Sequence, residues 1–256
     1  MKRFFQILLF SLFTVLVIVL LVYVYIEHEK EPLQQVNINV ARSSDMGFLD
    51  KDAIYNHIEK QLNDTIKLKD IDLSFIEDSL LKTPWIDKID AYTDINGDLI
   101  INIKESEPVL RVYNQYGKSF FLDRNGKIIP LSRKYTPRLS VANGYIQTNP
   151  VKGFTNINDT VYKFSDLKKL LAISEQIEQF PLLKSLISEI YLNSNHQFDL
   201  IPMIGDQLIR LGDTTNLNHK LENLILFYKR SLIHGGWDKY KTLSLKYSNQ
   251  IVCTKK

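Results

Sequence analysis

The chain has 256 residues, of which 45% are hydrophobic and 24% are charged, and its formal net charge is +3. Lys2 and Arg3 precede a long apolar run; without them, 30 basic residues face 29 acidic ones, a formal charge near +1. Such a balance gives no electrostatic footprint for nucleic acid. The length and composition allow one or two compact domains with real cores, and they exclude a disordered chain.

An uncharged apolar run extends from Phe4 to Ile26, and the charged stretch Glu27-His28-Glu29-Lys30-Glu31 follows it directly. A helix over this run, at about 1.5 Å per residue, is about 34 Å long, enough to cross a hydrocarbon core of roughly 30 Å. The run is longer than the apolar part of a signal peptide, about 7 to 15 residues, and no small-residue cleavage site follows it. We therefore predict a single transmembrane helix over Phe4 to Ile26.

The charges on either side of this run predict its orientation. Lys2 and Arg3 lie before it and an acidic stretch lies after it, so the positive-inside bias places the N-terminus in the cytoplasm. Residues 1–3 are then the cytoplasmic end, 4–26 the span and 27–35 a linker. We expect a single-pass protein of the cell inner membrane with a periplasmic C-terminus.

The segment after the linker has five predicted elements in the order strand, helix, helix, strand, strand. Strands alternate apolar and polar residues, whereas the helices repeat apolar residues every three or four positions. A tight turn at Asn96-Gly97 is expected to join the last two strands. The elements are a strand at Val36–Val40, a helix after Asp50, a helix after Asp72 that Pro84 ends, and strands at Ile89–Thr93 and Leu99–Lys104.

The remaining sequence predicts more strands and one long amphipathic helix. A hairpin is expected around Asn125-Gly126, and a strand at Leu139–Gly144 ends in glycine. Further strands are predicted at Ile190–Leu192, Phe198–Ile201 and Gln207–Leu211, and Thr242–Tyr247 alternates as a last strand. The predicted helix has one apolar face, formed by Leu217, Leu221, Leu224, Ile225, Tyr228 and Leu232, which we interpret as core.

No arrangement of residues in the sequence predicts catalysis or metal binding. The five histidines are scattered, without His or Cys partners at zinc-ligand spacing, and no G-x-S-x-G elbow occurs. Asp94, Asn96, Asp98 and Glu105 match part of a calcium-loop pattern, but Leu99 stands where that loop needs glycine. The single cysteine, Cys253, is interpreted as a small apolar strand residue. We predict no catalytic residue, no metal, no cofactor and no small-molecule substrate.

Several strings along the chain resemble the FtsQ/DivIB family of bacterial cell-division proteins. Leu81-Lys82-Thr83-Pro84-Trp85-Ile86 is similar to the family's Pro-Trp helix end, and Ile103-Lys104-Glu105-Ser106-Glu107-Pro108 to its V-x-E-x-x-P strand exit. The hairpin from Phe120 to Leu131, the glycine-ended strand and Leu211-Gly212 resemble later family motifs. The resemblance implies an α+β fold: a POTRA domain (β-α-α-β-β) at residues 36–110, then a mixed C-terminal domain, 111–256, built on an antiparallel β-sheet with helices.

The resemblance also implies a function without catalysis. Family members are bitopic scaffolds of the divisome at the septum, and their C-terminal strand region binds FtsB, called DivIC in Gram-positive bacteria, together with FtsL. These partners control the septal peptidoglycan synthase pair FtsW and FtsI. The matching stretch here is about Lys241 to Val252, and the candidate partner-binding residues are Lys246, Tyr247, Ser248 and Asn249. An alternative places Tyr247 in the core beside Leu243 and Leu245, since the three share strand parity.

Two other functions remain open from the sequence. A membrane-anchored periplasmic cell-envelope hydrolase would need Ser, His and Asp side chains that converge in a pocket. A POTRA-containing envelope assembly or secretion factor normally carries several such modules and a barrel, whereas this chain shows one module.

Overall fold

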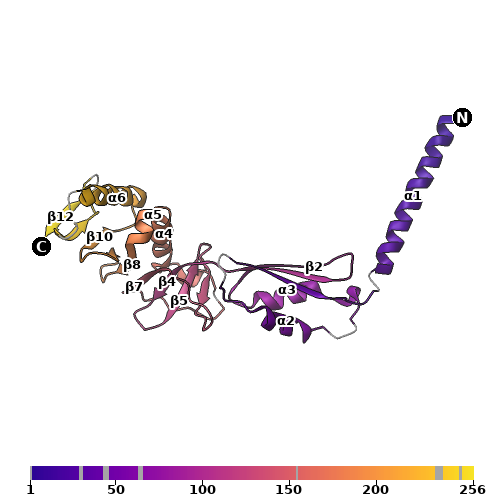
Figure 1. Cartoon of the computed structure of the whole chain (residues 1–256), viewed down its shortest axis with the longest axis horizontal. Helices are drawn as coiled ribbons and strands as arrows, with labels where there is room; N and C mark the ends of the chain where they lie inside the picture. Colours follow the sequence, from indigo (N-terminus) through magenta and orange to yellow (C-terminus); the bar gives the residue numbers. More distant parts are fainter. Residues whose placement is uncertain are drawn as a thin grey trace. The chain divides into compact units, whose positions relative to one another are not determined.

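A computed structural model describes residues 2–28, 31–42, 46–62, 66–153, 155–233, 239–247 and 250–256 (Figure 1). It divides into two compact units, Met1–Ser106 and Glu107–Lys256. The predicted division into a cytoplasmic end, span, linker and two domains stays a prediction.

The first unit begins with helix α1, Lys2–His28. Its large apolar side chains between Leu9 and Tyr25 are exposed. The side chains of residues 4, 5, 7, 8 and 26, which belong to the predicted span, lie outside the described residues. Among the residues that are described, no helix has both the length and the apolar character needed to cross a membrane. The predicted transmembrane helix is therefore not confirmed by the structure.

The rest of the first unit has the predicted order of strand, helix, helix, strand and strand. Asp50 and Asp72 act as N-caps, since their carboxylates accept the backbone N–H groups of Asp52 (3.1 Å) and Phe75 (2.9 Å). The elements are β1 (Val36–Ala41), α2 (Lys51–Glu59), the short 3₁₀ helix η1 (Leu68–Asp70), α3 (Leu73–Leu81), β2 (Ile86–Thr93) and β3 (Leu99–Glu105).

These three strands form a sheet in the order β1-β3-β2, in which β1 is parallel to β3 and β2 is antiparallel to β3. A tight hairpin can join the antiparallel pair, whereas the parallel pair needs the longer connection that the helices provide. Ile54 and Ile58 of α2 and Ile76 and Leu80 of α3 are buried in one cluster with sheet residues such as Ile101. The helices thus supply the core of this unit.

The two family-like motifs of this unit meet the same loop. Glu105 is buried at the end of β3, and one of its carboxylate oxygens accepts the backbone N–H of Phe48. The Phe48 ring stacks on Trp85, with ring centroids 6.5 Å apart. A side chain at Gly47 would overlap the Glu105 carboxylate. The Pro-Trp helix end and the glutamate of the strand exit therefore hold the segment that leads into α2.

The second unit is built on a sheet of nine described strands in the order β12-β11-β10-β9-β8-β7-β4-β5-β6. The hairpin at Asn125-Gly126 and the predicted strands near 140, 190, 200 and 209 are confirmed. The strands are β4 (Pro108–Tyr113), β5 (Ser119–Asp123), β6 (Ile128–Pro130), β7 (Ser140–Gly144), β8 (Ile187–Leu192), β9 (Phe198–Pro202), β10 (Leu208–Gly212), β11 (Tyr240–Ser244) and β12 (Val252–Lys255).

The prediction of an antiparallel sheet was only partly right, because the sheet is mixed. The pairs β4–β7, β7–β8 and β10–β11 are parallel, whereas the other described pairs are antiparallel. Two of the parallel pairs enclose helical crossovers: α4 and α5 lie between β7 and β8, and α6 lies between β10 and β11. A chain that crosses over a sheet through a helix returns in the same direction, which makes its strands parallel.

Helices α4 (Leu167–Glu178), α5 (Pro181–Leu186) and α6 (Leu217–Ile233) share one core with alternate residues of the sheet. The predicted apolar face of α6 is confirmed for Leu221, Leu224 and Tyr228, which are buried, while the side chain of Leu232 lies outside the described residues. Helix α4 was not predicted, although Leu167, Leu170, Leu171, Ser174 and Ile177 follow helical spacing and are buried.

A steric restriction explains why glycine stands at the end of β7. Gly144 has a φ of +98°, a backbone conformation that L-residues with a side chain rarely adopt. A Cβ at this position would overlap the backbone carbonyl oxygen of Leu192, the residue paired with Gly144 across the parallel ladder. Strand β7 can therefore approach β8 this closely only with glycine here.

The core role of α6 predicts a contrast between two leucines two positions apart. The Leu224→Ala variant of the full chain should lose about 2–5 kcal/mol of unfolding free energy, because Leu224 is fully buried. Leu226→Ala should change it by less than about 0.5 kcal/mol, because Leu226 is 51% exposed. Urea unfolding followed by circular dichroism measures both. Equal losses in the two variants would contradict the described orientation of α6.

Candidate functional site

The C-terminal hairpin forms the outer end of the nine-stranded sheet. Strand β11 lies between two neighbours: it runs parallel to β10 and antiparallel to β12. The predicted last strand, Thr242–Tyr247, is therefore not the outer strand, and it ends earlier, at Ser244. No bounds were predicted for strand β12, although Cys253 was expected to lie in a strand. In the described part of the chain, no strand pairs with the side of β12 that faces away from β11.

Two backbone hydrogen bonds indicate which backbone groups of β12 face outward. The N–H of Leu245 donates to the carbonyl of Arg210 (2.9 Å), so Thr242 and Ser244 turn their backbone groups the other way, toward β12. The N–H of Lys256 donates to the carbonyl of Lys239 (3.2 Å). Because backbone groups alternate sides along a strand, Cys253 and Lys255 present their N–H and C=O groups away from β11.

At the opposite end of the same sheet, another segment of the chain covers part of the edge strand β6. Strand β6 pairs with β5 on one side, and on the other its Ile128 N–H donates to the carbonyl of Thr155 (2.7 Å). The N–H of Ile157 donates to the carbonyl of Gly126 (2.8 Å), next to β6. The segment near residue 156 thus occupies part of this edge, so β12 is the more open end of the sheet.

The four candidate residues follow β11 in the connection to β12. Ser248 and Asn249 lie outside the described residues, and Lys246 and Tyr247 are exposed. Leu243 and Leu245 are 1% and 2% exposed, whereas Tyr247 is 55% exposed. The alternative that Tyr247 packs in the core is therefore wrong, because the chain has left the ladder before this residue. Partner binding by the four residues stays a prediction.

Contacts with two loops fix the course of Lys246. Its ammonium group donates a hydrogen bond to the side-chain oxygen of Gln197, which follows the β8–β9 turn. The aliphatic part of Lys246 passes over Gly212, where a Cβ would lie 3.0 Å from Cγ of Lys246. The Leu211-Gly212 motif therefore leaves room for the lysine that follows β11.

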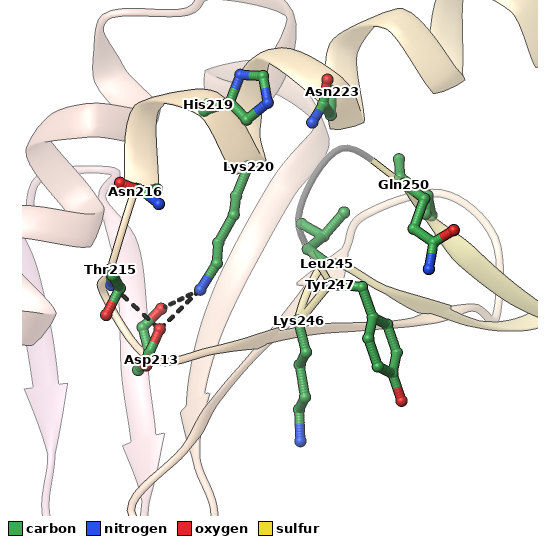
Figure 2. A pocket seen from close by; sticks show the side chains of 11 residues that line it. Asp213, Thr215, Asn216, His219, Lys220, Asn223, Leu245, Lys246, Tyr247 and Gln250 are labelled. Atoms are coloured by element: carbon green, nitrogen blue, oxygen red, sulfur yellow. Dashed lines mark hydrogen bonds and ion pairs between the residues drawn. The ribbon is translucent and has the colours of Figure 1, made fainter.

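A pocket of about 250 Å³ lies between the start of α6 and this connection (Figure 2). Sequence reasoning missed it, because its two sides are about 30 residues apart in the chain. Most of its lining side chains are polar or charged. They belong to Asp213, Thr215, Asn216, His219, Lys220, Asn223, Leu245, Lys246, Tyr247, Gln250 and Ile251.

An ion pair stabilises the α6 side of the pocket. The ammonium of Lys220 donates to Oδ1 of Asp213 (2.8 Å) and to its backbone carbonyl (2.9 Å), and Oδ1 also accepts the N–H of Thr215 (3.1 Å). The hydrogen bond from Lys220 lowers the pKa of Asp213 below its ordinary 3.8. Burial opposes this effect, and the hydrogen bond from Thr215 adds to it. This carboxylate is therefore already paired, and it anchors the loop before α6.

The hairpin is strongly basic. Residues 239–256 contain five lysines and no acidic residue. Lysines along an edge strand oppose self-association of identical chains, because like charges would meet. They also favour a partner segment that carries acidic side chains.

The chemistry of Cys253 fits a structural role. The prediction of a strand residue is confirmed, since Cys253 lies in β12 and is partly buried. Burial raises the pKa of its thiol, so the nucleophilic thiolate is disfavoured. Among the described residues, no group of three or more His, Cys, Asp or Glu side chains could hold a metal ion.

The Asp213–Lys220 pair predicts a specific pH dependence. A carboxyl group whose pKa is lowered in the folded state adds stability above its ordinary value of 3.8, and this stability is lost as the pH falls through the folded-state pKa. Wild type should thus be more thermostable than Asp213→Asn at pH 7, and the difference should shrink below about pH 4. The effect is small, because the Asp213 side chain is 70% exposed. Lys220→Met should remove the same pH dependence; a difference in Tm that is constant from pH 7 to 2.5 would refute the pairing.

Comparison with known proteins identifies both units. A model described as "FtsQ/DivIB, C-terminal related" matches residues 107–254, and a model of the POTRA-like domain matches residues 33–104. The cell division protein FtsQ of Rhodothermus marinus (strain ATCC 43812 / DSM 4252 / R-10) is 24% identical over 229 residues, which cover 88% of this chain and 78% of that protein. The first model includes the whole sheet up to Thr254 of β12. This chain belongs to the FtsQ/DivIB family of cell division proteins.

Proposed function

We propose that this protein is a non-catalytic, bitopic inner-membrane scaffold of the division machinery, and that its β12 edge accepts a strand from an FtsB/DivIC-type partner. Through that partner it would also assemble with an FtsL-type protein and act indirectly on the FtsW/FtsI synthase pair at the septum. The observation that supports this proposal best is the outer side of β12, where no described strand lies. Family membership supplies the context of cell division.

Strand addition uses groups that β12 already presents. The N–H and C=O groups of Cys253 and Lys255 face outward and can each exchange two hydrogen bonds with an added strand. The backbone would provide the affinity, and side chains on alternate positions would select the partner. The side chains of Val252, Thr254 and Lys255 are exposed along β12, so they are available for that selection.

Charge adds a second criterion for the partner. The five lysines of residues 239–256 would attract an acidic segment and speed its association at low salt. Lys246 is held by Gln197 beside the pocket of Figure 2, next to exposed Tyr247. These two residues lie in the connection to β12, where a side chain that flanks an added strand could reach them.

The proposed membrane anchor rests on the sequence of residues 4–26. The stretch from Phe4 to Ile26 has no charged residue, and its described large apolar side chains are exposed. In water, so continuous an apolar surface would be unfavourable, whereas in a bilayer it would contact lipid. Residues 1–3 would then be cytoplasmic and residues 27–256 periplasmic, in accord with the charges on the two sides.

A hydrolase is the less favoured function. The first unit has a contact between Ser79 and His57 (3.4 Å), and the second unit has one between His196 and Asp166 (2.8 Å). Neither contact joins serine, histidine and aspartate, and Lys169 also binds the Asp166 carboxylate (3.0 Å). The assembly-factor alternative would require further modules, and one POTRA-like domain is matched here.

Two substitutions at one position separate the backbone from the side chain. Lys255→Pro removes an outward N–H of β12, and proline is tolerated on edge strands where its N–H would face solvent. Loss of one backbone hydrogen bond should weaken binding of the FtsB/DivIC-type protein from the same bacterium by roughly 2- to 13-fold. Lys255→Ala keeps the N–H, so at 0.5 M salt, where charges are screened, it should bind like wild type.

Calorimetric titration of the purified full-length proteins at 0.5 M salt gives these affinities, and thermal unfolding confirms that each variant is folded. If folded Lys255→Pro and Lys255→Ala bind equally well, the partner does not add a strand to β12. If neither the variants nor wild type binds the FtsB/DivIC-type protein, the proposed partner is wrong.

A further inference from the structure

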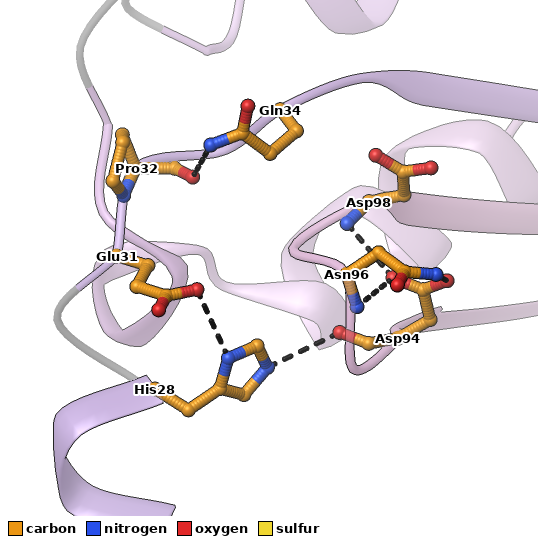
Figure 3. A network of polar contacts seen from close by, with 7 residues as sticks. All are labelled: His28, Glu31, Pro32, Gln34, Asp94, Asn96 and Asp98. Carbon is orange, nitrogen blue, oxygen red and sulfur yellow. Dashed lines mark hydrogen bonds and ion pairs between the residues drawn. The ribbon is translucent and has the colours of Figure 1, made fainter.

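The end of α1 contacts the β2–β3 hairpin of the same unit through one histidine. His28 is in the last turn of α1, and its ring lies between two oxygen atoms (Figure 3). Nδ1 is 3.2 Å from Oε2 of Glu31, and Nε2 is 3.2 Å from the backbone carbonyl oxygen of Asp94. The two oxygens come from different segments, so the ring bridges the helix end and the hairpin tip.

Several hydrogen bonds within the hairpin tip fix the position of the Asp94 backbone carbonyl. The Asp94 carboxylate accepts the backbone N–H groups of Asn96 (2.9 Å) and Asp98 (3.0 Å) and the side-chain amide of Asn96 (3.0 Å). The carbonyl oxygen of Asp94 also accepts the N–H of Gly97 (3.1 Å). The hydrogen bond from Asp98 lowers the pKa of Asp94, so its carboxylate remains ionised at neutral and mildly acidic pH.

The hydrogen-bond chemistry of this bridge requires two donors on one ring. A carboxylate oxygen and a backbone carbonyl oxygen are both acceptors, and a neutral imidazole carries only one N–H. The imidazolium form carries two and can donate to Glu31 and Asp94 at once. The bridge is therefore complete only when His28 is protonated.

Most of the charged groups named around His28 are acidic. Glu31 faces it from the segment after α1, Asp94 and Asp98 lie on the hairpin tip, and Glu27 precedes it in the helix. The dipole of α1 adds partial negative charge at the C-terminal end of the helix. Lys67, on the segment that pairs with Pro32, is a cation on a neighbouring element.

We propose that His28 is a proton-dependent latch that fixes the end of α1 on the β2–β3 hairpin at mildly acidic pH and releases it as the ring loses its proton. Imidazole side chains in proteins generally change charge between about pH 5 and pH 8, and this is the range over which the latch is to be tested. The latch does not depend on partner binding at β12. Where α1 is anchored in a membrane, as proposed above, it would set how freely the POTRA-like domain moves relative to the anchor.

Distances between spin labels test the latch in the full-length protein. Labels at Leu12→Cys and Ile95→Cys, in a Cys253→Ser background, report on α1 and the hairpin tip, and both native side chains are exposed. Leu12 is 16 residues before His28, about 24 Å along a helix, which suits pulsed electron paramagnetic resonance. We expect a narrow distance distribution at pH 5.5 and a broad one at pH 8.0.

Three variants test whether the His28 bridge causes the change in the distance distribution with pH. His28→Gln should give the broad distribution at both pH values, and Glu31→Gln, which replaces the carboxylate with a neutral amide and so weakens one hydrogen bond of the bridge, should broaden the distribution at pH 5.5. His57→Gln, which removes the histidine of α2, should keep the wild-type response. Distributions that are the same at pH 5.5 and 8.0 in wild type would overturn the latch, as would a His28→Gln protein that still responds to pH.

Discussion

An unpaired strand edge has backbone donors and acceptors that must be met by water, by side chains or by another strand, and this constraint governs the second unit. Its sheet grows from β4 in two directions. At the β6 end, the segment near residue 156 meets part of the edge. At the other end, the crossover through α6 places β11 beside β10, and β12 folds back as the last described strand. The topology therefore fixes where a partner strand can be added.

Core packing of α6 against the sheet supports the β11–β12 hairpin and therefore the open edge at β12. Leu221, Leu224 and Tyr228 of α6 pack in the same cluster as Leu243 of β11, which holds the crossover helix against the sheet. Gly144 and Gly212 allow backbone or side-chain approaches that a Cβ would obstruct. Without the α6 contact, β11 would lose its support and β12 would have no strand to pair with. Partner binding at β12 and the stability of the packing between α6 and β11 should therefore be coupled.

Much of the fold could be predicted from the sequence, because the residues that determine it act locally. Asp50 and Asp72 cap the helices that follow them, Pro84 lies just after the second helix, and the Asn-Gly pairs at 96–97 and 125–126 form hairpin turns. The interpretation of the α6 face as core is confirmed for its described residues. Family motifs then linked these elements, and the matched family models agree with that assignment.

The site was harder to predict, because it depends on register and long-range pairing. Strict alternation from Thr242 to Tyr247 suggested one strand, but Tyr247 is exposed after the chain has left the ladder. Strand β12 is four residues long and mostly exposed, so its apolar pattern is weak. The parallel pairs arise from crossovers that no local pattern reveals. The His28 bridge joins residues 66 positions apart, so no local pattern in the sequence predicts it.

The most direct test of the proposed strand edge is backbone hydrogen exchange of the full-length protein, with and without the FtsB/DivIC-type partner. In the free protein, the outward amides of Cys253 and Lys255 should exchange quickly, because no described strand pairs with them. Partner binding should slow exchange in the peptide that covers residues 250–256. Protection elsewhere in the second unit, with residues 250–256 unchanged, would contradict strand addition at β12.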